Sequence, residues 1–196
     1  MHTLILPKQY VNDAPDEMRA LVWAALAVVE PLPPGPELLE ALIDAAADAA
    51  LFGRPEEAVS FSDRALAVAE QAGLTPPARA LSFRGMARCM LGDVGGLGDY
   101  REALGLASAA GEGRLAASIY NNFAITLRSF EGPAAALALF EAGAEFAAAR
   151  GLREVLLGIS TSMLPVLIDL GRFDDALRQS AELQGLAEST GDEFDL

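Results

Sequence analysis

The sequence predicts an all-α protein, a solenoid of about four helix pairs preceded by one further helix. Glycines recur with a period of about 40 residues in two interleaved sets, and the stretches between them are rich in alanine and leucine, which favour helix. The sets are Gly53, Gly92, Gly132 and Gly171, and Gly73, Gly111, Gly151 and Gly191. Two helix-ending glycines in each period are typical of a helix–turn–helix repeat.

The turn glycines and the prolines predict where each helix begins and ends. Residues 1–14 are expected to form an irregular lead-in, and a helix from about residue 15 to 30 ends at the proline-rich segment 31–36. The helix pairs are predicted at about 36–72, 75–110, 112–150 and 152–190, within a single domain 15–196. Loops of two to six residues make neighbouring helices antiparallel. In the second pair, Thr75 is expected to cap a helix with Pro76 and Pro77 in its first turn.

Charge and hydropathy limit the partners. The formal net charge is −14, which opposes binding to nucleic acid or anionic lipid because both require clustered cations. Lys8 is the only lysine, and the arginines are scattered over the chain. We find no run of about 20 apolar residues that would span a membrane, and the first residues lack the pattern of a secretory signal. We therefore expect a cytoplasmic protein.

The chain offers few groups for catalysis. Cys89 is the only cysteine and His2 the only histidine, so a disulfide, a zinc cluster of these residues and an ordinary Cys–His pair are excluded. Cys89 is expected to be a buried apolar residue. The glycine-rich run 95–98 follows a helix rather than a strand, so it predicts a flexible turn and no phosphate loop. The prediction is a non-enzymatic protein without catalytic residues, metal or cofactor.

Two segments carry a resemblance. Segments 53–58 (GRPEEA) and 171–176 (GRFDDA) resemble the second half of a tetratricopeptide repeat (TPR), and Tyr120, Phe123 and Ala124 fit the pattern of its first helix. The period exceeds the usual length of about 34 residues and is similar to the long-helix variant of large bacterial regulators. The resemblance implies a right-handed α–α superhelix, whose first helices line a concave groove.

A narrower resemblance covers about residues 36–196. The motifs of segment 79–112, together with those at 120–123, 131–133, 149–152 and 191–192, resemble the C-terminal helical arm of large bacterial proteins. Those proteins join a nucleotide-cyclase or DNA-binding module to an AAA-type ATPase. The chain has no Gly-x-x-x-x-Gly-Lys-Ser/Thr sequence, so the ATPase chemistry does not carry over. The resemblance implies a regulatory arm.

One candidate site lies on the helix predicted at 112–130. At 100° per residue, the apolar residues of this helix (Ile119, Phe123, Leu127 and Phe130) share one face, and a polar stripe lies opposite. This stripe contains Arg114, Ser118, Asn121, Asn122, Ile125 and Ser129. Asparagine amides both donate and accept, so they suit the backbone of an extended peptide in the groove. The alternative is that they satisfy polar groups of neighbouring helices.

A second candidate consists of Arg79, Arg84 and Arg88 on the preceding first helix. These arginines could hold a carboxylate or phosphate of a partner in the same groove. The alternative is pairing with acids of a neighbouring helix, in a chain that contains 28 acidic residues.

The leading functional hypothesis is a scaffold that holds a protein or peptide, as the regulatory arm of a signalling ATPase or cyclase. The alternatives are a sensor arm for a small molecule or signalling peptide, and a structural module for self-association. An uncapped apolar repeat end would favour stacking on a second copy, so we expect weak dimerisation. Alanine replacement of Asn121 and Asn122, and a thermal-shift screen of metabolites, would separate the scaffold from the sensor.

Overall fold

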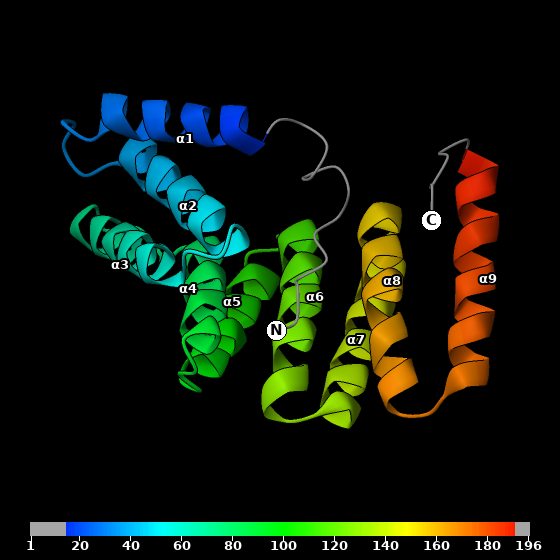
Figure 1. Cartoon of the computed structure of the whole chain (residues 1–196). Coiled ribbons are helices and arrows are strands. Elements are labelled where there is room, and N and C mark those ends of the chain that lie inside the picture. Colours follow the sequence, from blue (N-terminus) through cyan, green and yellow to red (C-terminus); the bar gives the residue numbers. More distant parts are fainter. Residues whose placement is uncertain (1–14, 191–196) are drawn as a thin grey trace. The chain divides into compact units, whose positions relative to one another are not determined.

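A computed structural model describes residues 15–190, and this part of the chain is a succession of nine helices (Figure 1). Their bounds are α1 Pro15–Val29, α2 Pro36–Leu51, α3 Pro55–Gln71, α4 Ala78–Met90, α5 Gly96–Ala109, α6 Gly113–Phe130, α7 Pro133–Ala148, α8 Arg153–Asp169 and α9 Phe173–Thr190. The all-α prediction of four helix pairs after a first helix is confirmed. The predicted lead-in 1–14 and the turn at Gly191 lie outside the described residues.

The start of α4 differs from the prediction. The helix begins at Ala78, so Thr75 does not cap it, and Pro77 stands at the N-cap position with φ −72° and ψ 119°. The reason is local, because a residue that precedes a proline is disfavoured in the α region. Thr75 and Pro76 both precede prolines, so the helix starts only after the second proline.

The turns use glycine for its backbone freedom. Seven of the eight predicted turn glycines have φ between +67° and +88°, the left-handed region that side chains disfavour. At most of these turns the residue after the glycine donates its N–H to the carbonyl five residues earlier, as Asp93 does to Arg88 at 2.9 Å. This is the Schellman arrangement, which satisfies carbonyls that the helix end would leave unpaired. The recurring glycine therefore sets the period of the fold.

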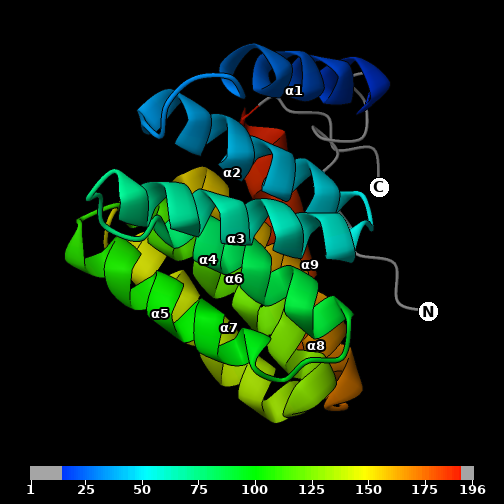
Figure 2. The same ribbon diagram turned by 90° about the vertical axis from the view of Figure 1, so that its left-hand side faces the viewer.

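The chain divides into two compact units, Met1–Leu106 and Ala107–Leu196. In the first unit α2 packs against α1, α3 and α4, and α3 packs against α4. Figure 2 shows α2, α3 and α4 layered one on the next. Its core contains the buried residues Leu26, Leu38, Leu39, Leu42, Ile43 and Val68. Whether residues 15–196 unfold as a single domain stays a prediction.

In the second unit α7 packs against α6 and α8, α8 against α9, and α6 also against α8 (Figure 1). Its core contains the buried residues Leu137, Phe140, Ile159, Met163, Val166 and Leu167. In both units the first helices of successive pairs touch each other, α2 with α4 and α6 with α8. Within each unit, this contact defines a face made of first helices alone.

Small residues allow helices to cross closely. A Cβ atom added at Gly85 of α4 would lie 2.8 Å from the carbonyl oxygen of Gly96 in α5, and one added at Gly96 would lie 2.7 Å from Sγ of Cys89. The prediction of a flexible turn at 95–98 is therefore wrong in part. α5 already begins at Gly96, and this glycine serves the close approach of two backbones.

Candidate functional site

The predicted polar stripe of α6 lies on the side that faces α8. Arg114 donates from Nη2 to Oε2 of Glu154 at 2.8 Å, and Arg128 donates from Nε to Oδ2 of Asp169 at 2.5 Å. The partners are 40 and 41 residues apart, so each ion pair joins nearly equivalent positions of successive repeats. We call this surface the α6–α8 face; its polar row on α6 runs from Arg114 through Ser118, Asn121 and Asn122 to Arg128.

The two asparagines lie in the middle of this row. Asn121 donates from Nδ2 to Oδ1 of Asn122 over 3.4 Å, a long and weak hydrogen bond. The Oδ1 atom of Asn121 is buried, and no donor among the described residues reaches it. Ser118 donates its hydroxyl to the Arg114 carbonyl at 3.0 Å, so it is satisfied within its own helix. The row therefore holds one buried acceptor without a partner.

The opposite side of α6 forms core, as the sequence predicts, with one exception. Ile119, Phe123 and Leu127 are buried, whereas Phe130 is exposed. Phe130 is the last residue of α6, where the chain turns toward α7, so less of the packed surface covers it. The buried apolar face fixes the rotation of the helix and thereby aims the polar row at α8.

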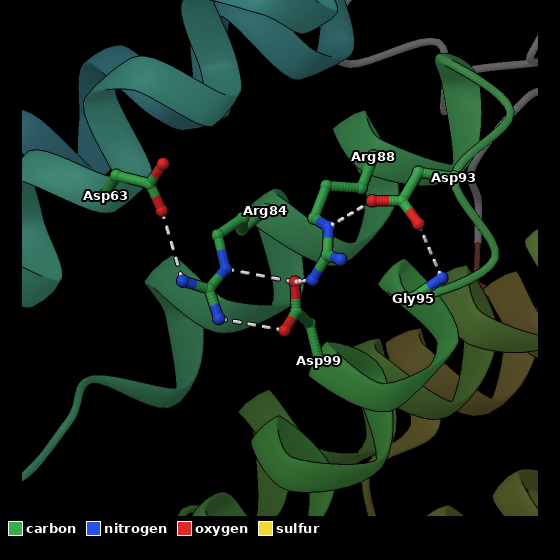
Figure 3. Close-up of polar contacts among 6 residues, drawn as sticks. All are labelled: Asp63, Arg84, Arg88, Asp93, Gly95 and Asp99. Atoms are coloured by element: carbon green, nitrogen blue, oxygen red, sulfur yellow. Dashed lines mark hydrogen bonds and ion pairs between the residues drawn. The ribbon is translucent and has the colours of Figure 1, made fainter.

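A second polar cluster surrounds Asp99 of α5 (Figure 3). Arg84 donates to this carboxylate from Nε at 3.0 Å and from Nη2 at 2.8 Å, and Arg88 donates from Nη1 at 3.0 Å. Arg84 also reaches Oδ1 of Asp63 in α3 at 3.1 Å, and Arg88 reaches Oδ2 of Asp93 at 2.8 Å. We call these five residues the Asp99 network. It ties α3, α4, α5 and the α4–α5 turn together.

The hydrogen bonds of the network favour the charged state of Arg84, Arg88 and Asp93, whose pKa values shift accordingly. The hydrogen bond to Asp99 is the largest reason that the pKa of Arg84 is raised, and burial opposes it. The Arg88 guanidinium, followed by the backbone N–H of Gly95, lowers the pKa of the Asp93 carboxyl. Three carboxylates face two guanidiniums in the network, so its net charge does not favour a further anion. For Arg84 and Arg88 the structure shows the pairing with acids that the sequence left as an alternative.

Arg79 lies apart from Arg84 and Arg88, so the structure does not bring the three arginines together. Its guanidinium contacts α2, at 3.4 Å from Oε2 of Glu40 and 2.6 Å from Oδ1 of Asp44. The rotation of a helix explains the separation, because five residues turn the direction by about 140° and nine residues by about 180°. Arg79 therefore lies on the face of first helices, whereas Arg84 and Arg88 point toward the second helices α3 and α5.

Sequence reasoning did not single out Asp99, the best-buried acid of the network. Its side chain is 7% exposed. One signal was present, since Gly96 and Ala103 lie three residues before and four residues after Asp99 and so share its side of α5. An acid flanked at helical spacing by small residues is expected to lie in a close crossing and to need a partner there.

Other kinds of site find little support in the described residues. Among them, no group of three or more His, Cys, Asp or Glu side chains could hold a metal ion. No helix in the range 15–190 is long and apolar enough to cross a membrane. Cys89 is buried as expected, and burial raises the pKa of its thiol to about 11. Such a thiol is a weak nucleophile at neutral pH.

Comparison with known proteins identifies the fold. No family model matches the sequence, and no curated protein matches it. Solved structures do match, and two of them are crystal structures of nearly identical TPR-like repeats from a protein of Podosopora anserina described as a kinesin light chain. One of them, a variant with a single substitution, has a TM-score of 0.66 at 16% identity, and the match covers 94% of this chain and 92% of that one. The other has a TM-score of 0.63 at 15% identity, with 93% and 92% covered.

These matches establish a TPR-like fold for this chain and confirm the first resemblance. At such low identity they show the fold alone.

Proposed function

We propose that the protein is a scaffold that binds an extended peptide segment along the α6–α8 face. The observation that carries this proposal is the buried Oδ1 atom of Asn121, which lacks a donor among the described residues. Leaving a buried acceptor unpaired costs about 1–3 kcal/mol. Binding would require the Asn121 side chain to turn toward solvent, where a backbone N–H of the peptide would supply the missing bond. The amide of Asn122 would meet the same backbone from the neighbouring position.

The row also has a suitable length. From Arg114 to Arg128 the helix rises about 21 Å, at about 1.5 Å per residue. An extended peptide covers about 3.3 Å per residue, so about six residues would span the row. The ion pairs with Glu154 and Asp169 make both ends of the row nearly neutral. Recognition would therefore depend on backbone hydrogen bonds more than on the charge of the segment.

The test uses a library of random six-residue peptides displayed on phage and selected against the full chain. Selected peptides are then titrated by fluorescence anisotropy against the wild type and the double variant Asn121→Ala/Asn122→Ala. Loss of two neutral hydrogen bonds, each of about 0.5–1.5 kcal/mol, should weaken binding roughly tenfold to a hundredfold. The variant should keep its helical circular dichroism.

Gln71→Ala is the matched control, because it removes an exposed amide from α3 and leaves the α6–α8 face unchanged. Peptides that bind the double variant as tightly as the wild type would refute the peptide site. A double variant that unfolds would show instead that the asparagines are structural.

A second candidate function, self-association, rests on α9. Phe173 and Leu177 are 60% and 70% exposed and lie one turn apart on this helix, and Ile168 of α8 is also exposed. An exposed apolar helix face of this kind favours contact with another molecule. We therefore propose weak dimerisation through this apolar surface of α8 and α9. Sedimentation velocity should show dimers at high concentration that the Phe173→Ser/Leu177→Ser variant lacks, and a wild type that stays monomeric would contradict it.

We also propose that the chain acts in the cytoplasm as the regulatory arm of a signalling ATPase or cyclase. The support is the resemblance of segment 79–112 and the motifs that follow it to such arms. The DNA on both sides of the coding segment tests this proposal. A continuous reading frame with a P-loop module would support it, and stop codons on both sides would refute it.

A further inference from the structure

A groove on the first unit lies beside α3, away from the contacts of the first helices. It consists of two adjoining hollows of about 710 Å³ and about 330 Å³, and both are lined by Asp63 and Arg84. The larger hollow extends to Leu74 and Pro76 in the α3–α4 loop, and the smaller one to Leu91 after α4. We call this surface the α3 groove. The peptide site proposed above plays no part in it, because that site belongs to the second unit.

One stripe of α3 forms the long wall of this groove. It consists of Val59, Asp63, Leu66, Ala67 and Glu70, all of which line one of the two hollows. Their spacing of four, three, one and three residues is that of a single helix face. The central part reads acid, apolar, apolar, acid at positions i, i+3, i+4 and i+7. The two acids are separated by about 10 Å along the helix axis.

The groove keeps negative charge in spite of its two arginines. Arg84 and Arg88 are held by Asp99 and Asp93, as described above. Asp63 is 56% exposed and contacts Arg84 through Oδ1 only. Glu70 is exposed and forms no ion pair with the described residues. The stripe therefore offers two carboxylates to solvent with apolar side chains between them.

The apolar parts of the groove are also accessible. Leu74 and Leu91 are among the exposed large hydrophobic side chains of the chain, and they lie in different hollows, with Asp63 and Arg84 common to both. A partner that covers them would remove apolar surface from water, which is favourable at about 25 cal/mol per Å². Because acids flank the apolar positions of the stripe, a complementary partner carries basic residues on both sides of its apolar residues.

We propose that the α3 groove docks a basic amphipathic helix from another protein. Its contact face carries Lys or Arg at two positions seven residues apart, with apolar residues at the third and fourth positions between them. A helix fits because its own i, i+3, i+4, i+7 face repeats the spacing of the α3 stripe. Its cations meet Asp63 and Glu70, and its apolar residues cover Leu66 and Ala67. The chain then holds two partners through different chemistry, one through backbone amides and one through charge.

The probe is a synthetic alanine-based helical peptide of about 18 residues with this pattern of lysines and leucines. It is titrated by fluorescence anisotropy against the full chain and against Glu70→Lys. The variant should weaken binding at least about fivefold, because an attraction becomes a repulsion. A second peptide, with glutamate in place of the lysine that faces residue 70, should bind Glu70→Lys more tightly than it binds the wild type.

Glu141→Lys is the matched control, since Glu141 is an exposed acid of α7 and the charge change is the same. It should leave the affinity for the lysine peptide unchanged. Equal weakening by both variants would overturn the proposal, because it would indicate general attraction to an acidic protein. A peptide of the same composition with its leucines moved off the face should bind at least about fivefold more weakly, and equal binding would also overturn it.

Discussion

Replacement of Asp99 by alanine tests whether the Asp99 network holds α4 and α5 together. The side chain of Asp99 is 7% exposed and accepts three N–H groups, two from Arg84 and one from Arg88. Alanine removes all three hydrogen bonds and the negative charge between the two guanidiniums. The guanidiniums of Arg84 and Arg88 then face each other across a small cavity, and less negative charge offsets their repulsion.

The loss of stability depends on the interactions that Arg84 and Arg88 keep in the variant. Breaking a fully buried ion pair by removing one partner costs about 3–5 kcal/mol. Here the side chains of Arg84 and Arg88 are 23% and 31% exposed, and each keeps one further carboxylate, Asp63 or Asp93. Water and these acids offset part of the loss. We therefore expect the free energy of unfolding to fall by about 2–3 kcal/mol.

The assay is urea unfolding followed by the fluorescence of Trp23, the only tryptophan of the chain. Trp23 packs against Phe61 of α3 with their ring centroids 5.4 Å apart, so its emission reports on the first unit. Circular dichroism at 222 nm reports on all helices in the same titration. If the fluorescence transition occurs at a lower urea concentration than the circular dichroism transition, the loss of stability lies in the first unit.

Asp63→Ala provides the comparison, because Asp63 is 56% exposed and contacts the same arginine. An exposed ion pair contributes about 0–1 kcal/mol, so this variant should be nearly as stable as the wild type. If Asp99→Ala and Asp63→Ala reduce the stability equally, burial does not strengthen the network and the reasoning fails.

Three further predictions concern the same crossing. Gly96→Ala should lower the free energy of unfolding by about 1–3 kcal/mol, because its Cβ would meet Gly85 and Cys89. At Gly98 an added Cβ has open space, so Gly98→Ala should be neutral or stabilise α5 by up to about 1 kcal/mol. Thermal unfolding compares the two variants, and a Gly96→Ala variant as stable as the wild type would mean that the crossing has room for a methyl group. The thiol of Cys89, with its pKa raised by burial from 9.0 to about 11, should react with a disulfide reagent at pH 8 about a hundredfold more slowly in the folded than in the unfolded chain. Because the unfolded chain releases this proton first, Cys89 should also reduce stability as the pH rises from about 9 to 11, and a Cys89→Ala variant should lack this contribution.

Features that depend on one residue or one helix were predictable from the sequence. A turn that needs positive φ selects glycine, so Gly53 to Gly171 mark the helix ends by identity alone. The rotation of α6 follows from its buried residues, because 100° per residue places Ile119 and Phe123 on one side and Asn121 on the other. Phe130 is exposed although it lies on the apolar side, because α6 ends at this residue and fewer core residues surround it.

Features that depend on two helices were not predictable. The chain has 28 acids, so the sequence offers Arg84 many partners and no reason to prefer Asp99. The choice is made by the crossing of α4 and α5, which Gly85 and Gly96 allow to be close. That crossing brings the first turn of α5 to the side of α4 that carries Arg84 and Arg88. The identity of the partner is therefore a consequence of packing.

The repeat also explains why two faces of the same fold offer different chemistry. Where first helices touch, equivalent positions meet, and arginines such as Arg114 and Arg128 find acids about 40 residues away. This pairing neutralises the α6–α8 face and leaves the uncharged amide oxygen of Asn121 as an acceptor without a donor among the described residues. Other acids lie away from this face, and on α3 they include Asp63, which contacts Arg84 but is 56% exposed, and Glu70, which forms no ion pair with the described residues. Salt screens exposed charges over about 10 Å at 0.1 M, whereas it has little effect on backbone hydrogen bonds. Added salt should therefore release a basic helix from the α3 groove and leave an extended peptide on the α6–α8 face bound.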